Sequence, residues 1–238
     1  MPWFLYETYG DTSTMARYYP QMQAFLQYIR TRKTGTGADA HIVDAALADW
    51  IAAEPTSGRI TGTWGYHQVA DRMAKTAALL GRDADAHEYC DLAAAIKEAF
   101  NAAFYNSALG RYTSDGDAGT TGATQALALD EGLDPESERK RVQDALVELI
   151  HGFQPFGGGP HFSGGTIGPA PIVRALTAGG RDDALWDVLQ EDTRPSYGLF
   201  MAPTTANPGG LTTISEHWGI DTSPSRPPTP SPSPPWRV

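Results

Sequence analysis

The residues best suited to chemistry lie near the C-terminal end of the chain, within residues 211–221. There one carboxylate, Glu216, precedes an indole, Trp218, by two positions in a nearly uncharged stretch. A carboxylate that activates water and an aromatic face that packs against the C–H patches of a sugar ring are the pair that a sugar-cleaving site needs. A structural interpretation is also open, because Thr213 and Glu216 have the spacing of a capping box that begins a short helix, with Trp218 in the core.

Charge and composition restrict the partners and cofactors. The chain has 238 residues and a net charge of −10, which disfavours nucleic acids and anionic membranes because both would repel it. This net charge neither attracts nor repels a neutral sugar. The single cysteine, Cys90, excludes a disulfide framework within the chain, and no Cys/His set has the spacing of a zinc site. We therefore predict no metal and no cofactor.

The N-terminus lacks the basic start and long apolar core of a signal peptide. No run of residues approaches the roughly 18 to 20 apolar positions that a membrane-spanning helix requires. These features predict a soluble, cytoplasmic protein, an expectation that depends on Met1 being the true N-terminus.

The elements that must position these residues are helices. Apolar residues recur at helical spacing, and the pattern predicts helices over residues 3–9, 15–29, 66–80, 83–104, 120–131, 135–153, 167–178 and 182–190, with a further short one over 42–51. Several helix ends are followed by a glycine and an acidic start to the next helix, as at Gly81 and Gly179-Gly180. The irregular spacing of these turns argues against a repeat solenoid. We predict an all-α array of antiparallel helix pairs with long loops on one side.

The C-terminal end differs in composition. Seven prolines occur among serines and threonines after residue 222, and such a segment forms neither helix nor sheet core. We predict one domain over residues 1–221 and a disordered tail over residues 222–238. The alternative for the tail is a polyproline ligand for a partner domain.

Several stretches together resemble the catalytic domain of bacterial α-L-rhamnosidases, and their order and spacing make the resemblance specific. It covers about residues 2–221 and rests on the Pro-Trp-x-Leu-Tyr opening at residues 2–6, Ala48-Asp49-Trp50, Tyr66-His67, Thr124-Gln125, Pro195-Ser196-Tyr197-Gly198, and residues 212–218. In the second of these motifs the chain has alanine where the family has glycine.

The resemblance implies a partial (α/α)6 toroid of six hairpins and an inverting glycoside hydrolase for terminal α-L-rhamnosides. It implies that Glu216 is the general base. The expected sugar-binding residues are Asp49, Trp50, Tyr66, His67 and Trp218. Structural alternatives are a solvent-facing acid for Asp49, a core position for Trp50, and a hydrogen-bonded core or rim position for His67.

Two departures from the family pattern affect the expected activity. The family's general acid lies in a segment upstream of the Pro-Trp opening, and the family continues differently after Trp218. The chain also has about eight predicted helices, fewer than six hairpins contain. We therefore expect a fragment with impaired hydrolysis. The alternatives are another six-hairpin carbohydrate enzyme and a helical-hairpin scaffold or binding module. The sequence predicts neither the aglycone nor the oligomeric state.

Overall fold

The computed structural model describes residues 2–37, 40–114, 120–155, 157–203, 208–210 and 218. Over these residues the fold is almost entirely helical, with one two-stranded hairpin. The elements are α1 Pro2–Tyr9, α2 Ser13–Thr31, α3 Gly58–Leu79, α4 Asp83–Phe104, β1 Tyr105–Asn106, β2 Arg111–Tyr112, α5 Gly122–Asp130, the 3-10 turn η2 Glu136–Glu138, α6 Arg139–Gly152, α7 Pro169–Ala178, α8 Asp182–Gln190 and α9 Tyr197–Met201. The all-α prediction is confirmed.

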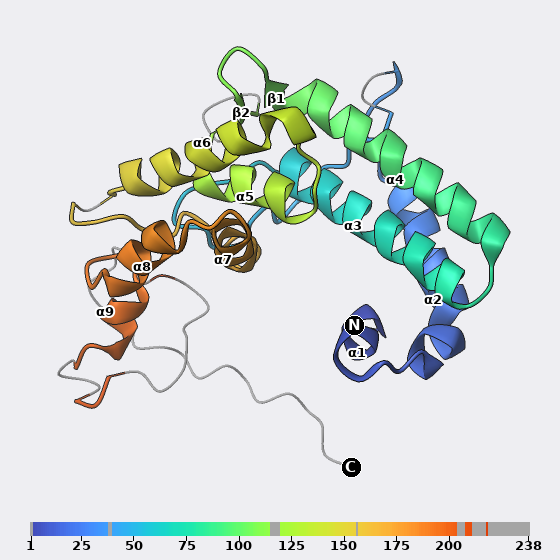
Figure 1. The fold of residues 1–238 in the computed structure, drawn as a ribbon, viewed down its shortest axis with the longest axis horizontal. Helices are drawn as coiled ribbons and strands as arrows, with labels where there is room; N and C mark the ends of the chain where they lie inside the picture. The colour runs from blue at the N-terminus through green and yellow to red at the C-terminus, as the bar shows by residue number, and fades with distance from the viewer. Residues whose placement is uncertain are drawn as a thin grey trace.

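The helices follow one another along an arc, with α1 and α2 at one end and α8 and α9 at the other (Figure 1). Turns that contain a glycine join the helices in pairs, α1 with α2, α3 with α4, α5 with α6, and α7 with α8. Gly10, Gly81, Gly132 and Gly180 have φ between 61° and 69°, a conformation that costs glycine little and other residues more. The remaining connections are longer. They therefore gather at the other end of the pairs, beside the N-termini of α3, α5, α7 and α9.

Two apolar clusters form the core. The larger surrounds α5, whose residues are buried from Gly122 to Leu129, and α5 packs against both α6 and α7. Its small residues allow that close approach. The buried amide of Gln125 accepts a hydrogen bond from the Tyr112 backbone N–H and donates one to the Tyr112 carbonyl, each at 2.8 Å. The second cluster joins α2, α3 and α4.

The helix expected over residues 42–51 does not form, and that prediction is wrong. Ala48 and Ile51 have φ of 49° and 59°, which a right-handed helix cannot contain. The segment instead runs tightly against the start of α3. That helix begins at Gly58, eight residues before the expected start, with Ser57 as its N-cap.

The structure also contains elements that the sequence pattern did not indicate. Residues 105–112 form a β-hairpin with Tyr105 opposite Tyr112, and α9 adds a short helix after Ser196. No helix among the described residues is long and apolar enough to cross a membrane. The predicted tail over residues 222–238 lies outside the described residues.

Candidate active site

A glycine-rich loop over residues 163–168, between α6 and α7, is the centre of the candidate site. The buried carboxylate of Asp49 accepts hydrogen bonds from three of its backbone N–H groups. The Gly165 N–H lies 2.9 Å from Oδ2, the Ile167 N–H lies 2.8 Å from Oδ1, and the Gly168 N–H lies 3.2 and 3.3 Å from the two oxygens. Because Gly168 immediately precedes α7, the carboxylate caps that helix from a distant part of the chain.

Trp50 contacts the same loop through its backbone. Its carbonyl accepts hydrogen bonds from the Thr166 N–H at 2.9 Å and the Thr166 hydroxyl at 3.1 Å. The contact is too close for a side chain, since a Cβ added at Gly165 would lie 2.3 Å from the Trp50 carbonyl oxygen. The Trp50 side chain is 47% exposed.

Backbone strain is concentrated on either side of Asp49 and Trp50. Ala48 precedes this pair and Ile51 follows it, and both are non-glycine residues in the left-handed region. Such conformations cost on the order of 1–3 kcal/mol each and persist only where the surroundings fix them. The hydrogen bonds to the glycine loop provide that fixation.

Trp218 reaches the glycine loop from the other side. Its indole Nε1–H donates to the Gly164 carbonyl at 2.6 Å, and the residue is buried. The ring stacks on Phe200 at 5.8 Å between centroids and an interplanar angle of 9°, and lies 6.2 Å from Phe162 and 5.2 Å from Tyr197. An aromatic cluster therefore anchors this indole beneath the loop.

Three of the predicted site residues, Asp49, Trp50 and Trp218, therefore contact the same short loop. Glu216 lies outside the described residues. The other two predicted residues lie elsewhere. Tyr66 is buried in the cluster between α2, α3 and α4, and burial lowers the pKa of the neighbouring His67 to about 4.

Glu54 also lies beside the glycine loop, and the sequence alone did not predict its position. The backbone N–H of Glu54 donates to the Ser163 carbonyl at 3.1 Å. Its Oε2 is buried and has no hydrogen-bond partner among the described residues. Burial raises the pKa of Glu54 to about 7. The sequence feature that could have indicated a buried carboxyl group is the apolar surroundings of Glu54, formed by Ala52, Ala53 and Pro55.

Hydroxyl groups connect this region to α5. The Thr56 and Thr121 hydroxyls lie 3.1 Å apart, and Ser163 Oγ accepts a hydrogen bond from the Ala123 N–H at 3.0 Å. The described residues contain no group of three or more His, Cys, Asp or Glu side chains able to hold a metal ion. The chemistry available here is that of carboxyl groups and aromatic faces.

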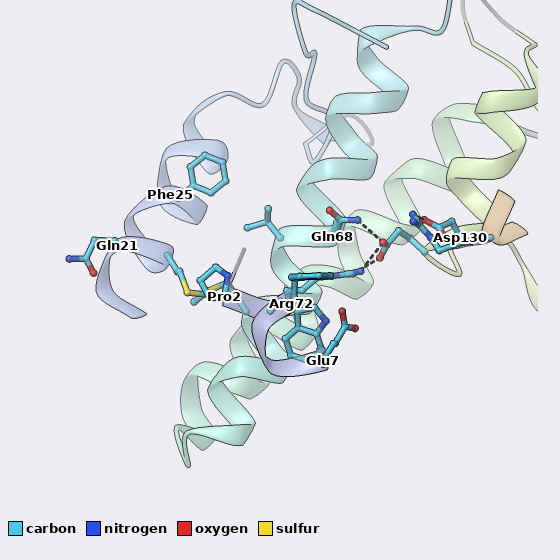
Figure 2. Close-up of a pocket in the computed structure, with 14 residues that line it drawn as sticks. Pro2, Glu7, Gln21, Phe25, Gln68, Arg72 and Asp130 are labelled. Carbon is cyan, nitrogen blue, oxygen red and sulfur yellow. Dashed lines mark hydrogen bonds and ion pairs between the residues drawn. The ribbon is translucent and has the colours of Figure 1, made fainter. Parts of the chain in front are cut away.

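A separate cavity of about 810 Å³ lies between α1, α2 and α3 and the C-terminal end of α5. Figure 2 shows Gln68 and Arg72 directed at one carboxylate, that of Glu131. Arg174 similarly forms two 2.6 Å hydrogen bonds with Asp130. These polar groups are paired with one another, so the loop end of the helices is the stronger candidate for an active site.

Comparison with known proteins gives a consistent result. The model of the bacterial alpha-L-rhamnosidase 6 hairpin glycosidase domain matches residues 1–231. The chain is 30% identical over 220 residues to an alpha-L-rhamnosidase of Streptomyces avermitilis, and 25% identical over 229 residues to one of Alteromonas sp.. Each alignment covers 92% of this chain, but only 19% and 23% of the relative.

Solved structures show the same likeness. The Streptomyces avermitilis alpha-L-rhamnosidase complexed with L-rhamnose has a TM-score of 0.74 at 28% identity, covering 92% of this chain and 19% of that one. The alpha-L-rhamnosidase from Dictyoglumus thermophilum also has a TM-score of 0.74, at 26% identity, covering 84% of this chain and 22% of that one. The chain therefore spans about a fifth of the length of these relatives.

Proposed function

This chain belongs to the bacterial α-L-rhamnosidase six-hairpin glycosidase family, and on that premise we propose that it forms part of an inverting catalytic domain for terminal α-L-rhamnosides. The observation that carries the proposal is the convergence of Asp49, Trp50 and Trp218 on the glycine loop. These residues come from two of the segments on which the family resemblance rests, and they lie at the end of the helices where the long connections gather.

Glu216 is the proposed general base. Trp218, two residues later, is fixed to the Gly164 carbonyl, and two residues of chain span at most about 7 Å. We expect the Glu216 carboxylate on the order of 10 Å from Asp49 or Trp50, the scale of an inverting site. A Glu216 side chain that caps a helix in solvent, away from this loop, would contradict the assignment.

The aromatic residues have different proposed roles. Trp50 is half exposed, so its indole can present a face to a sugar ring. Trp218 is buried among aromatic rings, so we assign it to holding Glu216 in place. For Tyr66 and His67 we propose a part in the core, because both are buried on α3. The proposed partner is a neutral rhamnosyl glycoside.

Hydrolysis by this chain alone is expected to be impaired. Inversion needs an acid that protonates the leaving oxygen while water attacks from the opposite face. The family resemblance implies that this acid belongs to a segment upstream of the Pro-Trp opening, so we propose that it is not among these 238 residues. Loss of a positioned general acid typically costs on the order of 10²- to 10⁴-fold in rate.

The dependence of the hydrolysis rate on the leaving group tests this proposal. A nitrophenyl α-L-rhamnoside hardly needs protonation, so it bypasses the acid but still requires the base. We expect slow turnover of this substrate, abolished by Glu216→Gln, and little turnover of a flavonoid rhamnoside. Turnover of the activated substrate that survives Glu216→Gln would exclude Glu216 as the base. Robust turnover of the natural substrate would show that the chain contains an effective acid.

A further inference from the structure

One peptide group connects Asp49 with Trp218. The Gly164 carbonyl, which accepts from the Trp218 indole at 2.6 Å, and the Gly165 N–H, which donates to Asp49 Oδ2 at 2.9 Å, belong to the same peptide unit. The orientation of this unit is therefore fixed from both sides. Asp49 and Trp218 are separated by more than half of the chain, yet a single planar group joins them.

The Asp49 carboxylate has little capacity left for a sugar hydroxyl. A carboxylate offers about four lone-pair sites, and three backbone N–H groups make four contacts with them, because the Gly168 N–H is shared between both oxygens. The side chain is only 4% exposed. Asp49 therefore acts on its surroundings through the backbone of the loop.

The negative charge strengthens this connection. A hydrogen bond to an ionised group is stronger than one between neutral groups, and withdrawal of the Gly165 proton toward the carboxylate polarises the Gly164 carbonyl toward the indole. An amide in place of the carboxylate cannot reproduce this arrangement. Whichever way an asparagine is turned, its NH₂ faces a backbone N–H, so at least one of the Gly165 and Ile167 contacts is lost.

We propose that Asp49 is a positioning residue, which acts through the peptide group between Gly164 and Gly165 to hold the Trp218 indole, two positions after Glu216. The role assigned to Glu216 rests on the proposed function. The connection between Asp49 and Trp218 does not, so the two can fail separately.

The connection between Asp49 and Trp218 can be followed by NMR, through the indole N–H resonance of Trp218 in the ¹⁵N-labelled full chain. The chain has six tryptophans, and the resonance is assigned by its loss in Trp218→Phe. We expect Asp49→Asn to move it upfield and to accelerate its exchange with water at least ten-fold, although Asp49 does not touch the indole. A change of less than two-fold in that variant would overturn the proposal.

Two control variants separate this effect from general damage to the loop. Asp44→Asn makes the same chemical change at an exposed position of the same connection. Thr166→Val removes only the hydroxyl contact to the Trp50 carbonyl. Both should leave the exchange rate of the Trp218 indole within two-fold of that in the unaltered chain. An effect of either control as large as that of Asp49→Asn would overturn the proposal.

Hydrogen exchange of two N–H groups in the unaltered chain provides a second test if Asp49→Asn does not fold. Because one peptide group links them, the Gly165 N–H and the Trp218 indole N–H should become exposed in the same opening event. Their protection factors should therefore agree within about three-fold and fall together as urea is added. Protection factors that differ by more than ten-fold would contradict the proposal.

Activity distinguishes this inference from the proposed function. If the chain hydrolyses the nitrophenyl rhamnoside, Asp49→Asn should lower kcat at least ten-fold with a smaller change in KM, because it displaces the base while Trp50 remains. Absence of turnover in the unaltered chain would contradict the proposed function. The exchange behaviour of the Trp218 indole would still decide the role of Asp49.

Discussion

Glu54 and Asp49 lie on the same connection between α2 and α3, yet their carboxyl groups have opposite surroundings. Asp49 accepts hydrogen bonds from three backbone N–H groups, whereas Glu54 has a buried oxygen without a partner among the described residues. Burial favours the neutral form and raises the pKa of Glu54 to about 7. Near neutral pH a fraction of this group is protonated, a state in which a carboxyl group can donate a hydrogen bond to a ligand.

The raised pKa of Glu54 predicts a pH-dependent cost to stability. Between its ordinary pKa of 4.5 and about 7, the folded chain binds more protons at this site than the unfolded chain, so stability falls as pH rises through that window. Glu54→Gln removes this loss. We expect the variant to gain on the order of 1 kcal/mol at pH 8, discounted for partial solvent screening, and little at pH 4.

Urea unfolding at the two pH values measures this difference. Glu98→Gln, at an exposed position on α4, is the matched control and should change stability by a similar small amount at both. A Glu54→Gln variant whose gain is equal at pH 4 and pH 8 would show that the carboxyl group is not held neutral by burial.

The sequence predicted which residues would meet better than it predicted how they meet. Asp49, Trp50 and Trp218 stood out as chemically suited residues, and all three contact the glycine loop. The loop itself was missed, because glycine, serine and threonine between two helices read as a simple connection. The contact from Asp49 to Gly165 spans 116 positions, and no local pattern encodes a contact of that range.

Helix α3 shows how packing overrides local propensity. Its first turns contain Gly58, Gly62 and Gly65, which disfavour a helix by about 1 kcal/mol each relative to alanine. Sequence periodicity therefore placed its start at residue 66. The helix begins earlier because the backbone of residues 43–45 packs directly against it, and a Cβ at Gly62 would lie 2.4 Å from the Val43 carbonyl oxygen.

Two glycines of α3 should respond oppositely to alanine. Gly62→Ala places a methyl group against fixed backbone and should destabilise the chain by about 1–3 kcal/mol. Gly65→Ala meets nothing within 4 Å and should stabilise it by about 0.5–1 kcal/mol through helix propensity. Urea unfolding compares the two. Equal effects would show that residues 43–45 do not approach α3 as described.

The turns between paired helices were the most predictable feature of the elements. Glycine followed by an acidic helix start identified the α3–α4 and α7–α8 turns, because a left-handed residue is needed where the chain reverses. The β-hairpin over residues 105–112 was not predicted. The buried amide of Gln125, on α5, forms hydrogen bonds with both the N–H and the carbonyl of Tyr112, a contact that the local sequence of the hairpin does not indicate.

At the scale of the whole molecule, most of the large exposed apolar side chains among the described residues lie at the two ends of the arc. On α1 and α2 they include Phe4, Phe25 and Tyr28, which are 60%, 53% and 57% exposed. At the other end Trp186 is 62% exposed and Met201 66%. Exposed apolar groups of this size favour association.

We therefore predict that the chain self-associates in solution. The net charge of −10 opposes association at low salt and is screened at 0.15 M and above, so the mean mass should rise with both protein and salt concentration. Light scattering after gel filtration measures it. Phe25→Ser combined with Tyr28→Ser should weaken association at least several-fold, whereas Leu109→Ser, an exposed residue near the middle of the arc, should not. A monomer at all concentrations would contradict the prediction.

The location of sugar binding is the most direct test of the proposed site, because the described residues offer the glycine loop and the cavity beside α1 as candidate places. We would titrate L-rhamnose into the ¹⁵N-labelled chain and record amide and indole shifts. We predict shifts of the Trp50 and Trp218 indoles and of the Gly164, Gly165 and Gly168 amides, with Trp3 and the amides around Arg72 unchanged. Shifts confined to the cavity that Trp3 and Arg72 line, with the glycine loop unaffected, would contradict it.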